Sequence, residues 1–553
     1  MRHHTLPILI ASLCSLSALV GCHGQETPSP MTGGGVEGGA RGDAGLNVNM
    51  GGDAEAGSEA GEMVIVEGGE TSAGDVAGGI AGEVAGDAAG EAAGDIAGES
   101  AGEAAGDVAG ALAGEALAGC AEGDTRRGDD SCGASDLGQR EQLCVEGVWT
   151  NTEVCLDDQL HEALIEQVTT YLATPHEQRA PFAEQSFAQT SLNQVTATRV
   201  EELLWGDYEQ RLTETARADH DLGEITVGET TMRYRCFEHG SRPDQGWTLY
   251  LSMHGGGGAP AQVNDQQWSN QQRLYDSTGL IQEGLYCAPR APTDTWNMWH
   301  RAHIDALFTQ LISRLIVLES VNPHRVMLMG YSAGGDGVYQ LAPRMADQIA
   351  AAAMSAGHPN NASPYGLRNI GFTIHMGALD TAYNRAGVAA EWAQRLAQLQ
   401  SASPEGSVAY QHEVTIHEGV GHWMSLRDAV AFNFMRPFTR SITPEVIHWQ
   451  QSPVLHERFY WLGADQPSAG DRVAATQEGQ RFTITPEQPA TLSLWLRDDQ
   501  VNLDQEIEVY HQGEVIYQGR VSRTASAIYR SLTERGDPAA IARAHVALPP
   551  IEP

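Results

Sequence analysis

The clearest catalytic spacing in the chain is the pentapeptide GYSAG at residues 330–334, a Gly-x-Ser-x-Gly motif centred on Ser332. Chance alone gives about 0.4 copies of such a motif in a chain with 62 glycines, so its context decides its weight. A strand pattern over residues 325–329 leads into the motif, and a helical pattern follows it. A strand, a glycine-flanked turn and a helix form a nucleophile elbow, which exposes a serine hydroxyl at the carboxyl edge of a sheet. The sequence therefore predicts Ser332 as the nucleophile of an acyl transfer.

A second glycine cluster, HGGGG, comes directly after a predicted strand that ends at Met253. The peptide N–H groups of Gly255 and Gly256, together with that of Ala333, are predicted to face an oxyanion. Preorganised donors of this kind stabilise a tetrahedral intermediate. We expect His254 to brace the loop and not to transfer protons. A mobile glycine loop without this role is the alternative interpretation.

An aspartate and a histidine follow Ser332 in the order that a serine, acid and base triad requires. Asp380 lies four residues after one predicted strand, and His422 lies six residues after the next. Both are therefore expected on loops at the carboxyl edge of the sheet, as in hydrolases with the order Ser, Asp, His. Glu418 and Asp428 are the competing carboxylates, but Asp380 alone follows the preceding strand.

Further aromatic and histidine side chains fall on loops that are expected to rim the same edge. They are candidates for lining a substrate pocket, with ordinary packing as the alternative. This set consists of His254, Trp296, Trp299, Tyr331, His358 and Trp423.

Beyond residue 223 the pattern alternates strands with helices, which predicts an α/β fold with a doubly wound, mostly parallel sheet. Between the third and fourth predicted strands, apolar residues from Ile304 to Leu318 recur at helical spacing, so this helix buries one face. The predicted strands are Thr231–Phe237, Thr248–Met253, Gly284–Cys287, Arg325–Met329, Ala350–Met354, Phe372–Met376 and Tyr410–Ile416.

Residues 223–440 resemble the α/β-hydrolases of the esterase and depolymerase group, on the strength of HGGGG, GYSAGG, the Asp380 loop and the GxGH loop at His422. That group includes acetylxylan and feruloyl esterases, polyhydroxyalkanoate depolymerases and dienelactone-hydrolase-like enzymes. The resemblance implies that Ser332 attacks an ester carbonyl, that His422 acts as general base and then acid, and that Asp380 orients the imidazole. It implies no metal and no organic cofactor. A prolyl-oligopeptidase-like peptidase and a non-catalytic surface-binding lipoprotein are the alternatives.

The amino terminus has the pattern of an export signal. Arg2 precedes an apolar run that ends in Leu-Val-Gly-Cys at Cys22, which resembles the lipobox of bacterial lipoproteins. Residues 1–22 are therefore interpreted as a signal peptide and Cys22 as a lipidation site that anchors the protein in a bilayer. An ordinary signal peptide is the alternative. We expect an exported protein, on the bacterial outer membrane or cell surface.

Residues 23–119 are low in complexity and rich in glycine, with an AGEx-type repeat of period four. The stretch from residue 31 holds 17 acidic residues against Arg41 alone, so it cannot bury enough apolar surface to fold and is expected to be a disordered tether. The whole chain carries a formal charge of −39 and contains no lysine. This charge argues against nucleic acid as a partner.

Four cysteines between residues 120 and 155 indicate a small disulfide-rich module of unassigned connectivity, because their spacing lacks the Cys-x-x-Cys pairs of a zinc site. A helical lead-in is expected over 156–222. The resemblance makes the strands of Cys236 and Cys287 neighbours, so these two form a disulfide or remain buried thiols. Residues 441–553 read as a small β-rich module that packs on the hydrolase or, alternatively, binds carbohydrate or polymer.

Overall fold

The structure, a computed structural model, describes residues 120–121, 123–132, 138–156 and 158–553. The predicted signal peptide, Cys22 and the repeat segment 23–119 lie outside the described residues. By their contacts, all described residues belong to one unit. Within the described part of the chain, no helix is both long enough and apolar enough to span a membrane.

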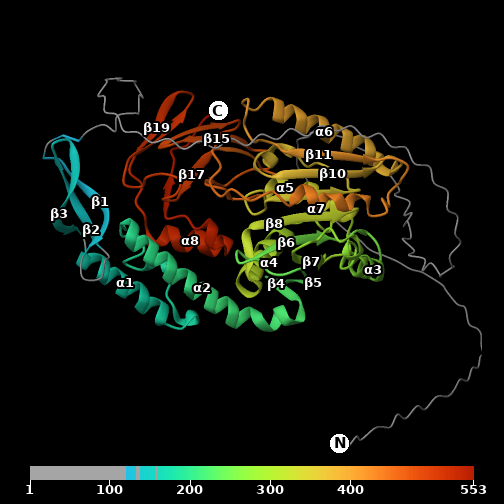
Figure 1. The fold of residues 1–553 in the computed structure, drawn as a ribbon, viewed down its shortest axis with the longest axis horizontal. Coiled ribbons are helices and arrows are strands. Elements are labelled where there is room, and N and C mark those ends of the chain that lie inside the picture. The colour runs from blue at the N-terminus through green and yellow to red at the C-terminus, as the bar shows by residue number, and fades with distance from the viewer. Residues whose placement is uncertain (1–119, 122, 133–137, 157) are drawn as a thin grey trace, which may run out of the picture. The chain divides into compact units, whose positions relative to one another are not determined.

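An eight-stranded sheet forms the centre of this unit, with the strand order β11-β10-β9-β8-β6-β7-β5-β4 (Figure 1). The strands from β11 to β7 are parallel, whereas β5 pairs antiparallel with both β7 and β4. The strands are β4 (Glu224–Val227), β5 (Thr230–His239), β6 (Trp247–Met253), β7 (Gly284–Arg290), β8 (Val321–Tyr331), β9 (Ala351–Ser355), β10 (Gly371–Gly377) and β11 (His412–His417).

The predicted α/β fold is confirmed, and all seven predicted strands are present with shifted ends. The last strand begins two residues later than predicted, because Tyr410 has a positive φ of 49° that breaks the extended chain. Strand β4 was missed in the sequence, since its four residues are too few to show an alternating pattern.

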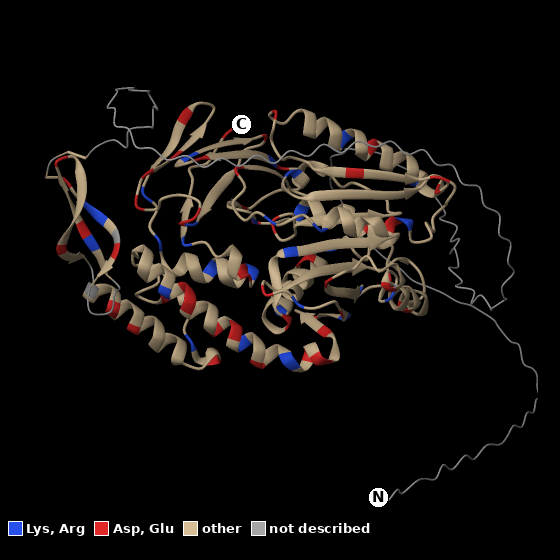
Figure 2. Ribbon diagram, viewed as in Figure 1, with Lys and Arg blue, Asp and Glu red and all other residues tan. Residues whose placement is uncertain are grey.

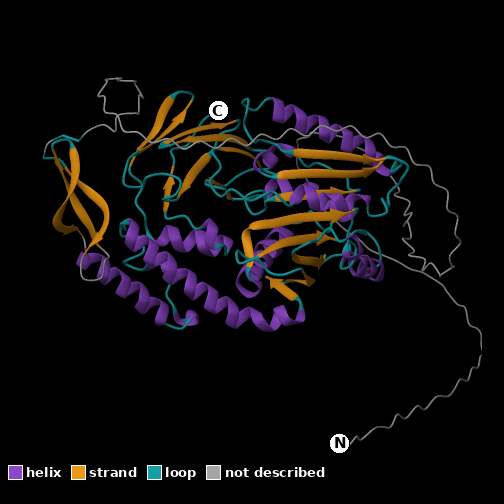
Figure 3. Cartoon of the chain, in the orientation of Figure 1, coloured by secondary structure: helices purple, strands orange, loops and turns teal. Residues whose placement is uncertain are grey.

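Helices cover both faces of the sheet (Figure 3), and alternate residues of a strand serve the two faces. Leu249 and Leu251 of β6 pack in the same cluster as helix α4 (Ala302–Glu319), whereas Tyr250 contacts Phe432 on the opposite face. The helical stripe predicted from Ile304 onward is thus confirmed as core. Strands β6, β9 and β10 contain no charged residue (Figure 2), as expected for strands buried on both sides. The other covering helices are α3 (Ala261–Gln271), α5 (Ala333–Arg344), α6 (Arg385–Ser401) and α7 (Ala431–Met435).

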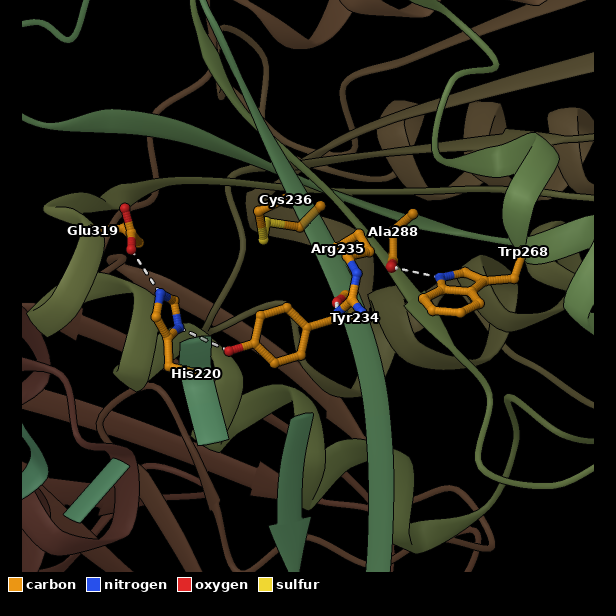
Figure 4. Close-up of a disulfide and its surroundings, with 8 residues drawn as sticks. His220, Tyr234, Arg235, Cys236, Trp268, Ala288 and Glu319 are labelled. Atoms are coloured by element: carbon orange, nitrogen blue, oxygen red, sulfur yellow. Dashed lines mark hydrogen bonds and ion pairs between the residues drawn. A yellow bond between two sulfur atoms is a disulfide. The ribbon is translucent and has the colours of Figure 1, made fainter. Parts of the chain in front are cut away.

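Cys236 and Cys287 lie directly opposite each other on β5 and β7 and form a disulfide (Figure 4). Close by, His220 in the last turn of α2 (Gln194–Leu222) links two other elements. Its Nδ1 lies 2.8 Å from the Tyr234 hydroxyl and its Nε2 lies 2.6 Å from a Glu319 carboxylate oxygen. These bonds join α2 to strand β5 and to helix α4, so the predicted lead-in is fastened to the eight-stranded sheet and its helices.

The cysteine-rich segment forms a three-stranded sheet of β1 (Thr125–Cys132), β2 (Gly138–Val145) and β3 (Val148–Leu156), followed by helix α1 (Asp158–Ala173). The structure decides the connectivity that the sequence left open. Its disulfides are Cys120–Cys144 and Cys132–Cys155.

The carboxyl-terminal region is β-rich, as predicted, and forms two sheets with the orders β12-β15-β16-β18-β19 and β13-β14-β17-β20. It also contains helix α8 (Ala525–Arg535), which was not predicted and packs with α2 through Ile528 and Leu532. The strands are β12 (Val446–Gln450), β13 (Arg458–Phe459), β14 (Leu462–Asp465), β15 (Arg472–Glu478), β16 (Arg481–Pro486), β17 (Thr491–Leu496), β18 (Ile507–His511), β19 (Glu514–Gly519) and β20 (Ala544–Ala547).

Buried ion pairs join this region to the part of the chain that forms the eight-stranded sheet. Arg440 bonds Asp537 at 2.5 Å with both side chains less than a tenth exposed. Asp305 of α4 accepts hydrogen bonds from both Arg344 and His456. Buried charges of this kind need their partners, because water cannot replace them. Residues 441–553 therefore pack against the α/β part of the chain, as the first of the two interpretations expects.

This packing predicts a large stability effect from a small substitution. Asp537→Asn keeps the shape of the side chain but leaves the buried Arg440 charge without its carboxylate, and we expect a loss of about 3–5 kcal/mol in the free energy of unfolding. Glu508→Gln, in the exposed pair with Arg481, is the control and should cost about 1 kcal/mol or less. The urea concentration at the unfolding midpoint is measured for both variants. Equal midpoints would show that the buried ion pair of Arg440 and Asp537 does not stabilise the fold.

Candidate active site

Ser332, His422 and Asp380 lie in one hydrogen-bonded chain at the carboxyl edge of the sheet. Ser332 Oγ is 2.9 Å from His422 Nε2, and His422 Nδ1 is 2.7 Å from Asp380 Oδ2. The imidazole is 43% exposed, whereas the Asp380 side chain is 1% exposed. The arrangement thus presents the serine and histidine to solvent and keeps the carboxylate dry, so that its hydrogen bond to the imidazole is strong.

The local sequence explains how Ser332 is held. Strand β8 ends at Tyr331 and α5 begins at Ala333, which leaves Ser332 alone in the turn with a positive φ of 57°. A side chain at Gly334 would come within 2.1 Å of the Met253 carbonyl oxygen, so only glycine allows the helix to approach β6. This geometry is the predicted elbow, and it aims the serine hydroxyl away from the sheet.

The HGGGG loop runs beside the serine. A Cβ built on Gly255 would lie 3.1 Å from Cβ of Ser332, and Gly256 and Gly257 have φ values of 109° and 123° that favour glycine. Within the described part of the chain, no acceptor bonds the amide N–H groups of Gly255, Gly256 and Ala333. These donors are therefore free for a substrate oxygen.

Asn264 in α3, which the sequence analysis missed, holds this loop. It is fully buried, accepts a hydrogen bond from Gly257 N at 3.0 Å and donates to Gly257 O at 2.9 Å. Its amide also donates to Asp294, which pairs with Arg290. No sequence signal singles out this asparagine, because its contacts come from a neighbouring helix and loop.

His254 braces the same loop through both ring nitrogens. Nε2 accepts a hydrogen bond from Ala291 N at 3.1 Å, so Nδ1 carries the proton and donates to Gly255 O at 2.6 Å. Complete burial lowers the pKa of His254 to about 3, which keeps the ring neutral. These contacts support a bracing role and leave no nitrogen for proton transfer.

Three of the six pocket candidates are buried in the structure. His254 and Trp299 are fully buried, and Trp299 Nε1 donates to the His254 carbonyl at 3.0 Å. Tyr331 is 7% exposed; its hydroxyl donates to His422 O and accepts from Met424 N. Their polar atoms are used in hydrogen bonds to neighbouring loop backbone, so these three side chains pack inward.

The other three candidates keep some exposure. Trp296 is 63% exposed beside Gly257 and Gly258, and Trp423, next to the histidine, is 40% exposed. His358 is half-buried, and its Nδ1 accepts a hydrogen bond from Asn360 N. The loops that bear the triad also expose Leu379 and Tyr383. The glycine loop and the loops of the candidate triad thus lie close in space or sequence to large exposed side chains.

Asp336, in the first turn of α5, was not predicted as a site residue. Its Oδ1 accepts a hydrogen bond from His358 N at 2.6 Å. Burial raises the pKa of Asp336 to about 6, and the bond to His358 and the nearby Arg385 charge oppose that rise.

The competing carboxylates lie elsewhere. Asp428 is buried and accepts a hydrogen bond from the Tyr275 hydroxyl at 2.7 Å. Neither Asp428 nor Glu418 bonds His422 among the described contacts, where Asp380 occupies Nδ1. Among the described residues, no cluster of three His, Cys, Asp or Glu side chains could hold a metal ion.

No protein-family model matches this chain, and no curated protein matches it either. Solved structures do match. The BES protein from Bacillus cereus shares 11% identity over 38% of this chain and 92% of its own, with a TM-score of 0.28. The poly(3-hydroxybutyrate) depolymerase LpqC from Bordetella parapertussis shares 17% identity over 37% of this chain and 83% of its own, with a TM-score of 0.29. A putative dipeptidyl aminopeptidase IV from Bacteroides ovatus shares 14% identity over 39% of this chain and 35% of its own, with a TM-score of 0.30.

The strand order, in which β7 lies between β5 and β6, and the elbow after β8 are those of the α/β-hydrolase fold. The eight-stranded sheet and its covering helices therefore have this fold, as the resemblance implied.

Proposed function

We propose that this protein is a serine hydrolase that cleaves carboxylic esters. The observation that carries the proposal is the hydrogen-bonded chain from Ser332 through His422 to Asp380, with the serine on an elbow and free amides beside it. Free donors, an exposed nucleophile and a base within hydrogen-bond distance are the parts that acyl transfer requires.

The reaction follows from these positions. His422 Nε2 takes the Ser332 proton as Oγ bonds to the ester carbonyl carbon, and the negative oxygen that forms accepts hydrogen bonds from the amides of Gly255, Gly256 and Ala333. Asp380 stabilises the imidazolium. The intermediate collapses, His422 protonates the departing alcohol, and an acyl-serine remains. Water then repeats the sequence with His422 as base, which releases the acid and restores the serine.

Two measurements test this proposal. A fluorophosphonate probe should label the protein at Ser332, which separates an enzyme from a surface-binding protein on the same fold. p-Nitrophenyl acyl esters should be hydrolysed faster than peptide anilides, which separates an esterase from a peptidase. No labelling, or faster cleavage of the anilides, would overturn the assignment.

We further propose that the enzyme is exported and held at a bilayer through a lipidated Cys22, with the acidic segment 23–119 as a tether. The lipobox-like sequence motivates this, and three disulfides suit an oxidising compartment. Mass spectrometry of the mature amino terminus should find lipid on Cys22, and an unmodified terminus at another residue would exclude the anchor.

The loop contact of Asn264 predicts a kinetic effect. Asn264→Ala removes both bonds to Gly257 and frees the amides of Gly255 and Gly256 to move, so we expect kcat to fall about tenfold to a hundredfold, somewhat less than the loss of an oxyanion donor itself. Gln266→Ala, on the exposed side of the same helix, is the control. An unchanged kcat in a folded Asn264→Ala variant would show that the loop needs no such support.

A further inference from the structure

The Asp380 carboxylate has a second partner besides the histidine. Arg385 Nη1 lies 3.4 Å from Oδ1, the oxygen that does not face His422. No other Lys or Arg lies within ion-pair distance of Asp380 in the described part of the chain. While His422 is neutral, Arg385 therefore supplies the one full positive charge beside this buried carboxylate.

Arg385 occupies a place that is unfavourable for an arginine. It is the first residue of α6, where the helix dipole repels a positive charge. Its side chain is only 14% exposed, and its Nε is buried without a hydrogen-bond partner among the described residues. Helix stability and solvation both disfavour this arrangement, so a favourable interaction must offset them, and the Asp380 carboxylate provides it.

The chain between the two residues forms a compact turn that keeps them together. Ala386 N donates to Asp380 O, and Tyr383 and Asn384 both have positive φ values, which turn α6 back toward the triad. The guanidinium also stacks on the exposed Tyr383 ring, 4.9 Å from its centroid. Arg385 is thus held against the carboxylate from the outer side.

We propose that Arg385 is a positioning residue of the triad: by holding Oδ1 of Asp380, it keeps Oδ2 directed at Nδ1 of His422. This inference rests on the proposed function. Without Arg385, Oδ1 has no ion-pair partner in the described part of the chain, so the carboxylate can turn away from Nδ1. The imidazole then holds the productive tautomer and orientation less often, which lowers kcat more than it raises KM.

The experiment is steady-state hydrolysis of p-nitrophenyl acetate, with kcat and KM measured separately. For Arg385→Met we expect kcat to fall about tenfold to a hundredfold with KM nearly unchanged, because the carboxylate is no longer held in line. Arg385→Lys, which keeps a positive group beside Oδ1, should recover part of that loss. Arg395→Met, an exposed arginine on the same helix, is the matched control and should keep the wild-type kcat.

A second comparison tests whether Arg385 acts through Asp380. In an Asp380→Asn background, Arg385→Met should cause no further fall in kcat. If Arg385→Met and Arg385→Lys lower kcat alike, or if Arg385→Met lowers kcat as much in the Asp380→Asn background as in the wild type, the role is structural and the proposal is wrong. If the wild type shows no turnover beyond that of Ser332→Ala, the proposed function itself fails, so the two failures are distinguishable.

Discussion

Ser332→Ala is expected to lose about six orders of magnitude in kcat on an activated ester, since removal of the nucleophile in a comparable triad costs about 10⁶. The alanine removes only Oγ, and the strained turn is kept by Gly330 and Gly334, which contact neighbouring backbone and not the hydroxyl. The thermal midpoint should therefore change little. Steady-state kinetics give kcat, and a melting curve gives the thermal midpoint.

Labelling supplies the control for this variant. The fluorophosphonate probe should modify the wild type and the Asn264→Ala variant but not Ser332→Ala. A Ser332→Ala variant that keeps more than a small fraction of activity would mean that another group attacks the carbonyl. The residual rate should come from the amides of the glycine loop, which remain in place.

Asp380→Asn is expected to lower kcat by about 10⁴, because an asparagine amide presented to Nδ1 stabilises the wrong tautomer of the imidazole. Asp380 Oδ2 lies 2.7 Å from His422 Nδ1. An NH2 group in place of this oxygen would donate to Nδ1 and not accept from it. The measurement is kcat of Asp380→Asn beside Glu418→Gln and Asp428→Asn on one ester.

The comparison variants behave differently for physical reasons. Glu418→Gln should be nearly neutral, since only the backbone carbonyl of Glu418 has a described partner, the Arg427 side chain. Asp428→Asn disturbs a buried bond to Tyr275, so its effect should appear in stability more than in kcat. If kcat fell less than tenfold in Asp380→Asn but by orders of magnitude in either of the other two variants, the acid of the triad would have to be reassigned.

Features set by neighbours along the chain were predictable from the sequence. The alternation of strands and helices, the apolar stripe of α4 and the glycine-flanked turn at Ser332 all arise within one element or one connection. The order of Ser332, Asp380 and His422 then placed three loops at one edge, because parallel strands end on the same side of a sheet.

Contacts between distant segments were decided only by the tertiary structure. Nothing local distinguishes Asn264 from other asparagines or Arg385 from the exposed Arg395 on the same helix, and their roles appear only when a glycine loop or a carboxylate is folded against them. The disulfide connectivity and the inward turn of Trp299 likewise depend on which strands and loops meet. A sequence pattern reports the face of an element that is buried, whereas the partner on that face is chosen by the packing of the whole chain.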